Sequence, residues 1–199
     1  MQNLFFFLFE ILIISLFAFL FVKELIRKKG RIYELLAGAI FGFLLEFGLT
    51  QATHAYEYTE NFKFFIFNIP LFIPLLWAVF FYLAMTFTDQ FEIPWYVKPF
   101  ADALIALNLD LMMDIIAIRL HFWHWLIPLD QEWYGVPFEN LAGWIIAAFV
   151  FSFLIRTLRR IESLSFGEFI KKIFINISKL IASFLAFILF IFFLSLYAG

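Results

Sequence analysis

Six apolar stretches, each long enough to cross a lipid bilayer as a helix, dominate this sequence. A hydrocarbon core about 30 Å thick needs about 20 apolar residues in helical form. The six stretches cover residues 4–22, 32–52, 64–87, 100–120, 141–158 and 173–197. Pro70 and Pro74 lie in the third stretch and are expected to kink its helix. The sequence predicts an all-α, polytopic membrane bundle of about six helices, with residues 1–199 forming a single transmembrane domain.

Composition agrees with a membrane protein and excludes several chemistries. Hydrophobic residues make up 65% of the chain, whereas soluble domains are about 45–50% apolar. Cysteine is absent, which excludes disulfide bonds, cysteine-ligated metal centres and thiol nucleophiles. The sequence also lacks glycine-rich phosphate loops and dinucleotide fingerprints. What remains is chemistry that carboxyl, hydroxyl, imidazole and aromatic groups can perform inside a bilayer.

Basic residues divide unevenly between the two ends of the predicted helices. Of 14 lysines and arginines, only Lys63 and Arg119 fall at one end, and the others lie in or beside the links at the opposite end. Cytoplasmic loops carry an excess of lysine and arginine. We therefore predict a multi-pass protein of the cell membrane with both termini on the non-cytoplasmic side. Residues 159–172 mix charges with apolar side chains and are predicted to form a short interfacial segment on the cytoplasmic side.

Acidic side chains lie inside the predicted fourth span, where a charge costs about 2.5–3.5 kcal/mol on insertion scales. Asp110 and Asp114 are four residues apart, so both carboxyls project from one face of the helix. In low dielectric two close carboxyls cannot both ionise easily, so the pair would hold a proton near neutral pH, as a general acid must. The alternative is a structural network in which Asp114 pairs with Arg119. Asp102, near the cytoplasmic end, is interpreted as an ordinary helix-end acid.

The second predicted span carries a polar stripe that contains Glu46. Gly38, Gly42, Thr50 and His54 share this stripe at four-residue intervals, so they form one slowly winding face. The glycines let a neighbouring helix approach closely. Glu46 has no cationic residue one turn away, which favours functional use over a structural hydrogen bond. With the two aspartates of the fourth span, Glu46 is predicted to be catalytic.

Aromatic side chains crowd the non-cytoplasmic ends of the same spans. The predicted substrate-binding residues are Tyr56, Tyr58, Trp123, Trp125, Tyr134, Asn140 and Trp144. One interpretation is an aromatic belt at the membrane interface. The other is a lid whose rings face a cation formed during reaction, a contact worth up to ~2 kcal/mol when desolvated. Gly135 and Pro137 predict a tight turn that could fold this segment back toward the bilayer.

Three histidines, His54, His121 and His124, raise the question of a metal site. Together with carboxylates they could ligate iron or manganese. Membrane di-iron oxygenases use many more histidines, grouped in boxes, than this chain contains. We therefore predict neither a metal site nor a cofactor.

Several short runs, taken together, match the pattern of a known family. The runs are Glu46 to Thr50, Tyr56 to Thr59, Ile69 to Leu71, Trp77, Asp110 to Asp114, Trp123 to Trp125, Tyr134 to Pro137 and Asn140 to Trp144. They resemble the CruF-type carotenoid biosynthesis family over residues 34–160. That family comprises membrane carotenoid 1,2-hydratases, including bisanhydrobacterioruberin and γ-carotene hydratases. The resemblance implies that water adds across the terminal C1=C2 double bond of a linear, ψ-end carotenoid without a cofactor.

The resemblance also suggests how the polar residues would act. Asp110 or Asp114 would protonate C2, the aromatic residues would shelter the tertiary cation at C1, and Glu46 or the second aspartate would take a proton from water. Two alternatives stay open. A lycopene-type cyclase would let the next double bond attack the cation, and a membrane transporter or assembly subunit would use the acids as a proton relay.

The expected partners follow from the same interpretation. They are the lipid bilayer, the carotenoid substrate and other enzymes of the carotenoid pathway, with no nucleic acid. The long polyene would enter its pocket from the lipid, between helices.

Overall fold

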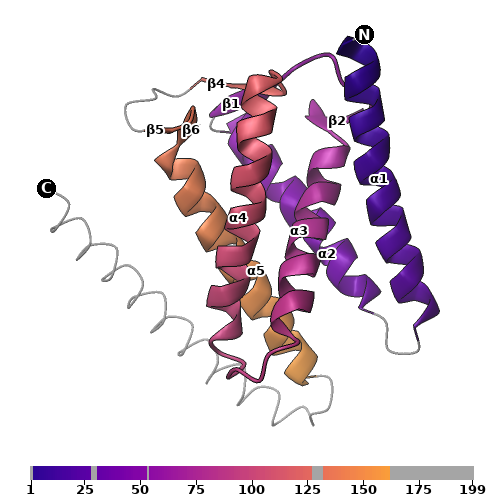
Figure 1. The fold of residues 1–199 in the computed structure, drawn as a ribbon, viewed down its shortest axis with the longest axis vertical. Helices are drawn as coiled ribbons and strands as arrows, with labels where there is room; N and C mark the ends of the chain where they lie inside the picture. The colour runs from indigo at the N-terminus through magenta and orange to yellow at the C-terminus, as the bar shows by residue number, and fades with distance from the viewer. Residues whose placement is uncertain (1, 28–30, 53, 127–131, 162–199) are drawn as a thin grey trace, which may run out of the picture. The chain divides into compact units, whose positions relative to one another are not determined.

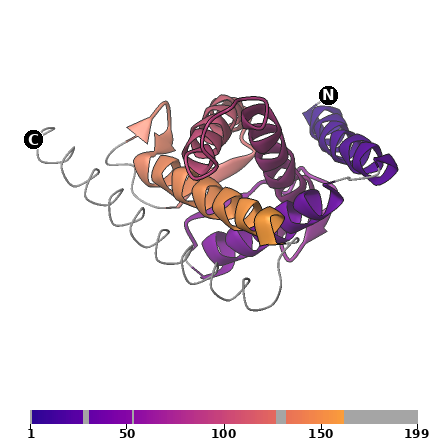
Figure 2. The same ribbon diagram turned by 90° about the horizontal axis from the view of Figure 1, so that it is seen from below.

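The computed structural model describes residues 2–27, 31–52, 54–126 and 132–161, and this part of the chain is mainly helical. Its α-helices are α1 (Gln2–Ile26), α2 (Ile32–Phe47), α3 (Phe72–Thr88), α4 (Lys98–Arg119) and α5 (Phe138–Ile161). A short π-helical turn, Gly48–Ala52, extends α2. The chain divides into two compact units, residues 1–153 and 154–199. Figures 1 and 2 show the helices of the first unit, in which α1 and α4 both pack against α3.

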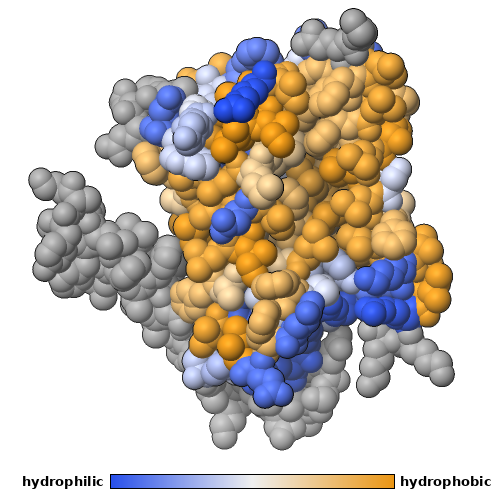
Figure 3. All heavy atoms as spheres, in the orientation of Figure 1, coloured by the Kyte–Doolittle hydropathy of each residue, from blue (hydrophilic) through white to orange (hydrophobic). Residues whose placement is uncertain are grey.

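The described residues are mainly helical and include apolar helices long enough to span a membrane, which confirms the predicted class. Within the described part of the chain, three segments are long and apolar enough to cross a bilayer: Leu4–Ile26, Ile32–Gln51 and Phe138–Arg160. Helix α4 has 22 residues, which corresponds to about 33 Å at a rise of 1.5 Å per residue. Figure 3 shows an apolar surface across the middle of the face in view, with hydrophilic residues at its two ends. The predicted sixth span, 173–197, and residues 162–172 lie outside the described residues.

The predicted third span is wrong in its first part. Helix α3 begins at Phe72, and the preceding residues form two antiparallel strands, β2 (Phe65–Ile66) and β3 (Ile69–Pro70). Phe67 and Asn68 connect them with positive φ angles of 49° and 63°, which is the conformation of a tight hairpin turn. Pro70 therefore lies before the helix and Pro74 lies in its first turn, where a missing N–H is tolerated. Neither proline sits in the helix interior, where a kink was expected.

Further short strands gather at the same end of the helices and were absent from the all-α prediction. Strand β1 (Tyr56–Tyr58) pairs with β4 (Trp123–Trp125), and β5 (Glu132–Trp133) pairs with β6 (Val136–Pro137). In the first pair Tyr56 lies opposite Trp125 and Tyr58 opposite Trp123. Because side chains alternate along a strand, these four rings share one face of the ladder. The intervening Glu57 and His124 are exposed.

Helices α2 and α3 approach closely because of two glycines. A Cβ atom on Gly38 would lie 2.9 Å from the Cα of Ala78, and one on Gly42 would lie 2.5 Å from the Cβ of Trp77. Gly42 thus leaves the space that the Trp77 side chain occupies. The predicted role of these glycines in helix packing is confirmed.

The substitution Gly42→Ala is expected to lower the free energy of unfolding by about 1–3 kcal/mol, the usual cost of overpacking. The new methyl group would push Trp77 away from α2. Gly48→Ala is the matched control, because nothing lies within 4 Å of a Cβ there and its φ of −61° suits alanine. Thermal unfolding of both variants in detergent measures the difference, and equal stabilities would contradict this account of the packing.

Polar contacts join the helices and their links at the end opposite the strands. Glu24 of α1 accepts a hydrogen bond from the Tyr82 hydroxyl at 2.5 Å and one from the Arg31 backbone N–H at 2.8 Å. The Arg31 guanidinium in turn lies 2.6 Å from a carboxylate oxygen of Asp89. The α1–α2 and α3–α4 links therefore meet at one end of the molecule. This fits the predicted grouping of basic links on one side, although which side is cytoplasmic stays a prediction.

Asp102 is not the ordinary helix-end acid that the sequence analysis expected. Its side chain is buried and accepts hydrogen bonds from the hydroxyls of Thr88, at 2.5 Å, and Ser152. These two residues belong to α3 and α5. One carboxylate of α4 therefore joins three helices.

Candidate active site

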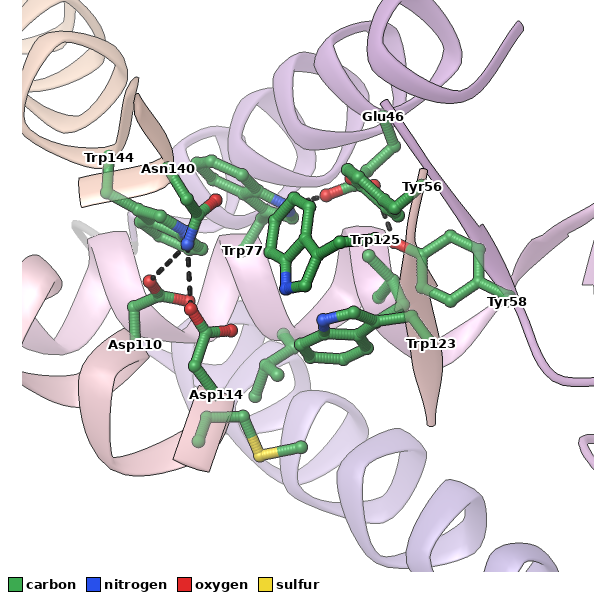
Figure 4. Close-up of a pocket in the computed structure, with 13 residues that line it drawn as sticks. Glu46, Tyr56, Tyr58, Trp77, Asp110, Asp114, Trp123, Trp125, Asn140 and Trp144 are labelled. Carbon is green, nitrogen blue, oxygen red and sulfur yellow. Dashed lines mark hydrogen bonds between the residues drawn. The ribbon is translucent and has the colours of Figure 1, made fainter. Parts of the chain in front are cut away.

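A pocket lies near the strands, where α2, α3, α4 and α5 meet the β1–β4 ladder (Figure 4). The empty space in this pocket, including the part that is open to the surroundings, is about 420 Å³. The residues that line it are Glu46, Tyr56, Tyr58, Ile73, Leu76, Trp77, Asp110, Met113, Asp114, Trp123, Trp125, Asn140 and Trp144. Among these described lining residues none is basic. The pocket therefore combines three buried carboxyls with aromatic and aliphatic walls.

Glu46, from α2, forms one side of the pocket and is held by three donors. Its Oε2 atom accepts hydrogen bonds from the hydroxyls of Tyr56 and Tyr58, the latter at 2.5 Å. Its Oε1 atom accepts a hydrogen bond from the indole Nε1 of Trp77 at 2.7 Å. The tyrosines lie beyond the second span, and burial raises the pKa of both phenols well above the ordinary value. Both phenols therefore remain protonated and donate to Glu46.

Asp110 and Asp114, from α4, form the opposite side of the pocket as seen in Figure 4. Only 4% of Asp110 and 3% of Asp114 is exposed. Asn140 of α5 donates from Nδ2 to Oδ2 of Asp114 at 2.7 Å and, with a longer contact of 3.5 Å, to Oδ2 of Asp110. The two aspartates thus share one neutral amide donor. The alternative with Asp114 paired to Arg119 is not seen, since Arg119 is exposed at the end of α4 and the described ion pairs do not include it.

Aromatic rings form the walls between these carboxyls. The rings of Trp77 and Trp144 stack with centroids 3.7 Å apart and planes 6° apart. On the ladder, Tyr56 contacts Trp125 edge to face with centroids 5.0 Å apart, and Tyr58 contacts Trp123 at 6.1 Å. Edge-to-face and stacked pairs are each worth about 0.5–1.5 kcal/mol beyond their buried area. The pocket wall is therefore held in place by its own rings.

The structure brings together all of the predicted catalytic and substrate-binding residues except Tyr134. Tyr134 occupies the turn between β5 and β6 with a φ of 52°, followed by Gly135 at 84°. This confirms the predicted tight turn. Its side chain is 69% exposed and is not among the residues that line the pocket.

The histidines considered as metal ligands also lie apart from the pocket. His54, His121 and His124 are all exposed. Within the described residues, no group of three or more histidine, aspartate or glutamate side chains has the geometry of a metal site.

Comparison with known proteins adds one finding to this geometry. A model of the carotenoid biosynthesis protein family matches residues 3–199. The chain belongs to this family. No curated protein and no solved structure gives a significant match. Membership confirms the predicted family and assigns the chain to carotenoid biosynthesis, and the match extends beyond the predicted limits of 34–160.

Four lining residues of this carotenoid biosynthesis protein were not predicted as site residues: Ile73, Leu76, Trp77 and Met113. Met113 is three residues from Asp110, so helical spacing alone places both on one face. Trp77 carried a different signal. An indole N–H in the middle of an apolar helix needs an acceptor, and Glu46 on the neighbouring helix supplies it.

Proposed function

We propose that this protein hydrates the terminal C1=C2 double bond of a linear, ψ-end carotenoid. The observation that supports the proposal most strongly is the convergence of Asp110, Asp114 and Glu46 on one aromatic pocket, with no basic residue among its described lining. Alkene hydration needs an acid strong enough to protonate carbon, a site that tolerates a carbocation, and one water molecule. Carboxyls among aromatic rings meet the first two needs without redox chemistry.

The aspartate pair supplies and recovers the proton. One aspartate is protonated, because two carboxyls that share a buried site with a neutral amide donor, and with no basic residue in its described lining, cannot both ionise easily. It transfers this proton to C2, which leaves a tertiary cation at C1. The oxygen of a water molecule then bonds to C1, and a proton of that water passes to the aspartate pair. At the end of the cycle one aspartate is again protonated. The net reaction converts an alkene and water into a tertiary alcohol.

Glu46 acts as the fixed negative charge opposite the acid. Burial disfavours a charge on Glu46, and its three hydrogen-bond donors counter that cost and favour the ionised form. The aspartates instead share the neutral donor Asn140. Different environments for neighbouring carboxyls are the usual way to separate an acid from an electrostatic stabiliser. In Figure 4 the indole of Trp125 lies between Glu46 and the aspartates. A cation formed between the Trp125 indole and the aspartates faces the ring, and the Glu46 carboxylate lies behind that ring.

The location of the pocket suggests how the substrate reaches it. The pocket is lined in part by β1 and β4. These strands lie at the end of the helices opposite the α1–α2 and α3–α4 links (Figure 1). With the basic links in the cytoplasm, the pocket would belong to the outer half of the membrane. A polyene is soluble only in lipid, so it would enter sideways and present one terminal double bond to the acids.

Expression of the full chain in a host that makes a linear carotenoid with ψ ends tests the proposal. Extracted pigment is expected to contain a product heavier than the substrate by one water per modified end, measured by mass spectrometry. A product of unchanged mass and altered retention would instead indicate a cyclase. Unaltered substrate, with the protein present in the membrane, would contradict both enzymatic functions and favour a transporter or assembly subunit.

A further inference from the structure

Two tryptophans of the pocket wall have indole N–H groups that no described residue satisfies. The Nε1 atoms of Trp123 and Trp125 are both buried, and neither has a hydrogen-bond partner in the described part of the protein. A buried donor left unpaired costs about 1–3 kcal/mol, and buried tryptophan N–H groups usually find an acceptor. Two such donors in one pocket are therefore a feature that packing does not explain.

The β1–β4 ladder aims both donors at the same space. Trp123 and Trp125 are two residues apart on β4, so their side chains leave the strand on the same face. Tyr58 and Tyr56 support the two indoles from the paired strand. Figure 4 shows both indole nitrogens turned toward the interior of the pocket, on the side where Asp114 lies.

Four other donors on the wall are already engaged. The hydroxyls of Tyr56 and Tyr58 and the indole of Trp77 donate to Glu46, and Asn140 donates to the aspartates. The two orphaned donors therefore require an acceptor that comes from outside the described protein. A hydrocarbon end group cannot be that acceptor, because it has no lone pairs.

We infer that the indole N–H groups of Trp123 and Trp125 hold the water molecule that captures the cation. This inference rests on the proposed hydration. A buried water makes two to four hydrogen bonds, and here its oxygen accepts from the indoles while its hydrogens face the aspartates. When the cation forms, the oxygen releases one indole and forms a bond to C1, an O–H bond breaks, and the proton passes to the aspartate pair. The second indole keeps the oxygen in place, so both tryptophans are positioning residues.

The inference gives these indoles a role that differs from cation–π shelter. The substitution to phenylalanine separates the two roles, because it keeps an aromatic face and removes the N–H. If the N–H groups position water, Trp123→Phe and Trp125→Phe still form the cation but capture it more slowly. The cation then loses a proton and returns to the alkene more often.

Deuterium exchange measures how often the cation returns to an alkene relative to its capture by water. Membranes containing the full-length protein and its carotenoid are incubated in D₂O, and both the hydrated product and the recovered substrate are analysed by mass spectrometry. When the cation returns to an alkene by losing the original hydrogen of C2, or a hydrogen of a methyl group on C1, the added deuterium stays in the recovered hydrocarbon. Each variant is expected to raise the ratio of exchange to hydration by about 3- to 10-fold, the worth of one hydrogen bond. The ratio is independent of the amount of folded protein.

The matched control is Trp133→Phe, the same substitution at an indole that is exposed and does not line the pocket. Its ratio is expected to equal that of the unsubstituted protein. Hydration with an unchanged ratio in both pocket variants would overturn the inference while leaving the proposed function intact. Absence of both exchange and hydration in the unsubstituted protein would overturn the proposed function itself.

Discussion

Asparagine in place of Asp110 or Asp114 is expected to lower the yield of hydrated carotenoid by about 10²- to 10⁴-fold, the range that a positioned general acid contributes. The amide has nearly the same shape as the carboxyl and leaves Asn140 in place, but it cannot donate a proton to carbon. Because the two carboxyls share one proton, neither is expected to replace the other. The measurement is the ratio of hydrated to unmodified pigment, normalised to the amount of protein in the membrane.

The matched control for the loss of a buried carboxylate is Asp102→Asn. Asp102 lies on the same helix and is equally buried, but it is outside the pocket. This variant is expected to hydrate carotenoid at close to the normal rate per folded molecule. The double variant Asp110→Asn with Asp114→Asn should lose little more than either single one, since residues that act as a unit are not additive. Full product in both single variants would remove the aspartates from the mechanism.

The aspartates were predictable because their relationship is local. A spacing of four residues fixes a shared helix face whatever surrounds it, and the buried pair on α4 follows from that rule. Glu46 was also predictable, since an acid in an apolar span is costly and therefore selected for a purpose. The hydrogen bond from Trp77 to Glu46 could not be predicted, because it joins residues that are 31 positions apart in the chain. It depends on the space left at Gly42, which is a property of the packed helices.

The strands were missed for a different reason. Tyr56 and Tyr58, like Trp123 and Trp125, show the alternation of a half-buried strand, but each run has only three residues. Such short runs become strands only because their partner, far away in the chain, is brought beside them. The first part of the predicted third span was wrong for a related reason. Residues 64–71 are apolar enough for a membrane helix, so hydropathy alone did not reveal their strands. Asn68 and Pro70 were the available signs of a turn and a strand.

The direction of the Tyr134 side chain could not be predicted from the sequence. The turn at Gly135 follows from local chemistry, but the direction in which the turn residue points depends on how the hairpin packs beside α4. The same rings in an aromatic-rich segment can therefore line a pocket, as Trp123 and Trp125 do, or face the surroundings, as Tyr134 does. Only the ladder with β1 distinguishes them.

Glutamine in place of Glu46 is the second substitution with a large expected effect, a fall in hydration of about 10²- to 10³-fold, as for other lost electrostatic contacts to a transition state. Glutamine can keep all three contacts. Its oxygen can accept from Trp77, and its amide can donate to phenol oxygens that now turn their hydrogens away. The fold is therefore expected to survive, while the negative charge facing the cation is lost.

Tyr58→Phe is the comparison that separates charge from geometry at Glu46. It removes one of the three donors and leaves the carboxylate, so a smaller fall of about 3- to 10-fold is expected from one lost hydrogen bond. In deuterated water, Glu46→Gln should lower exchange and hydration together, because it hinders formation of the cation and not its capture. A variant that lowers hydration alone would place Glu46 with the water instead, as the acceptor of its proton. The two readouts thus assign the carboxylate to one step of the reaction, either formation of the cation or its capture.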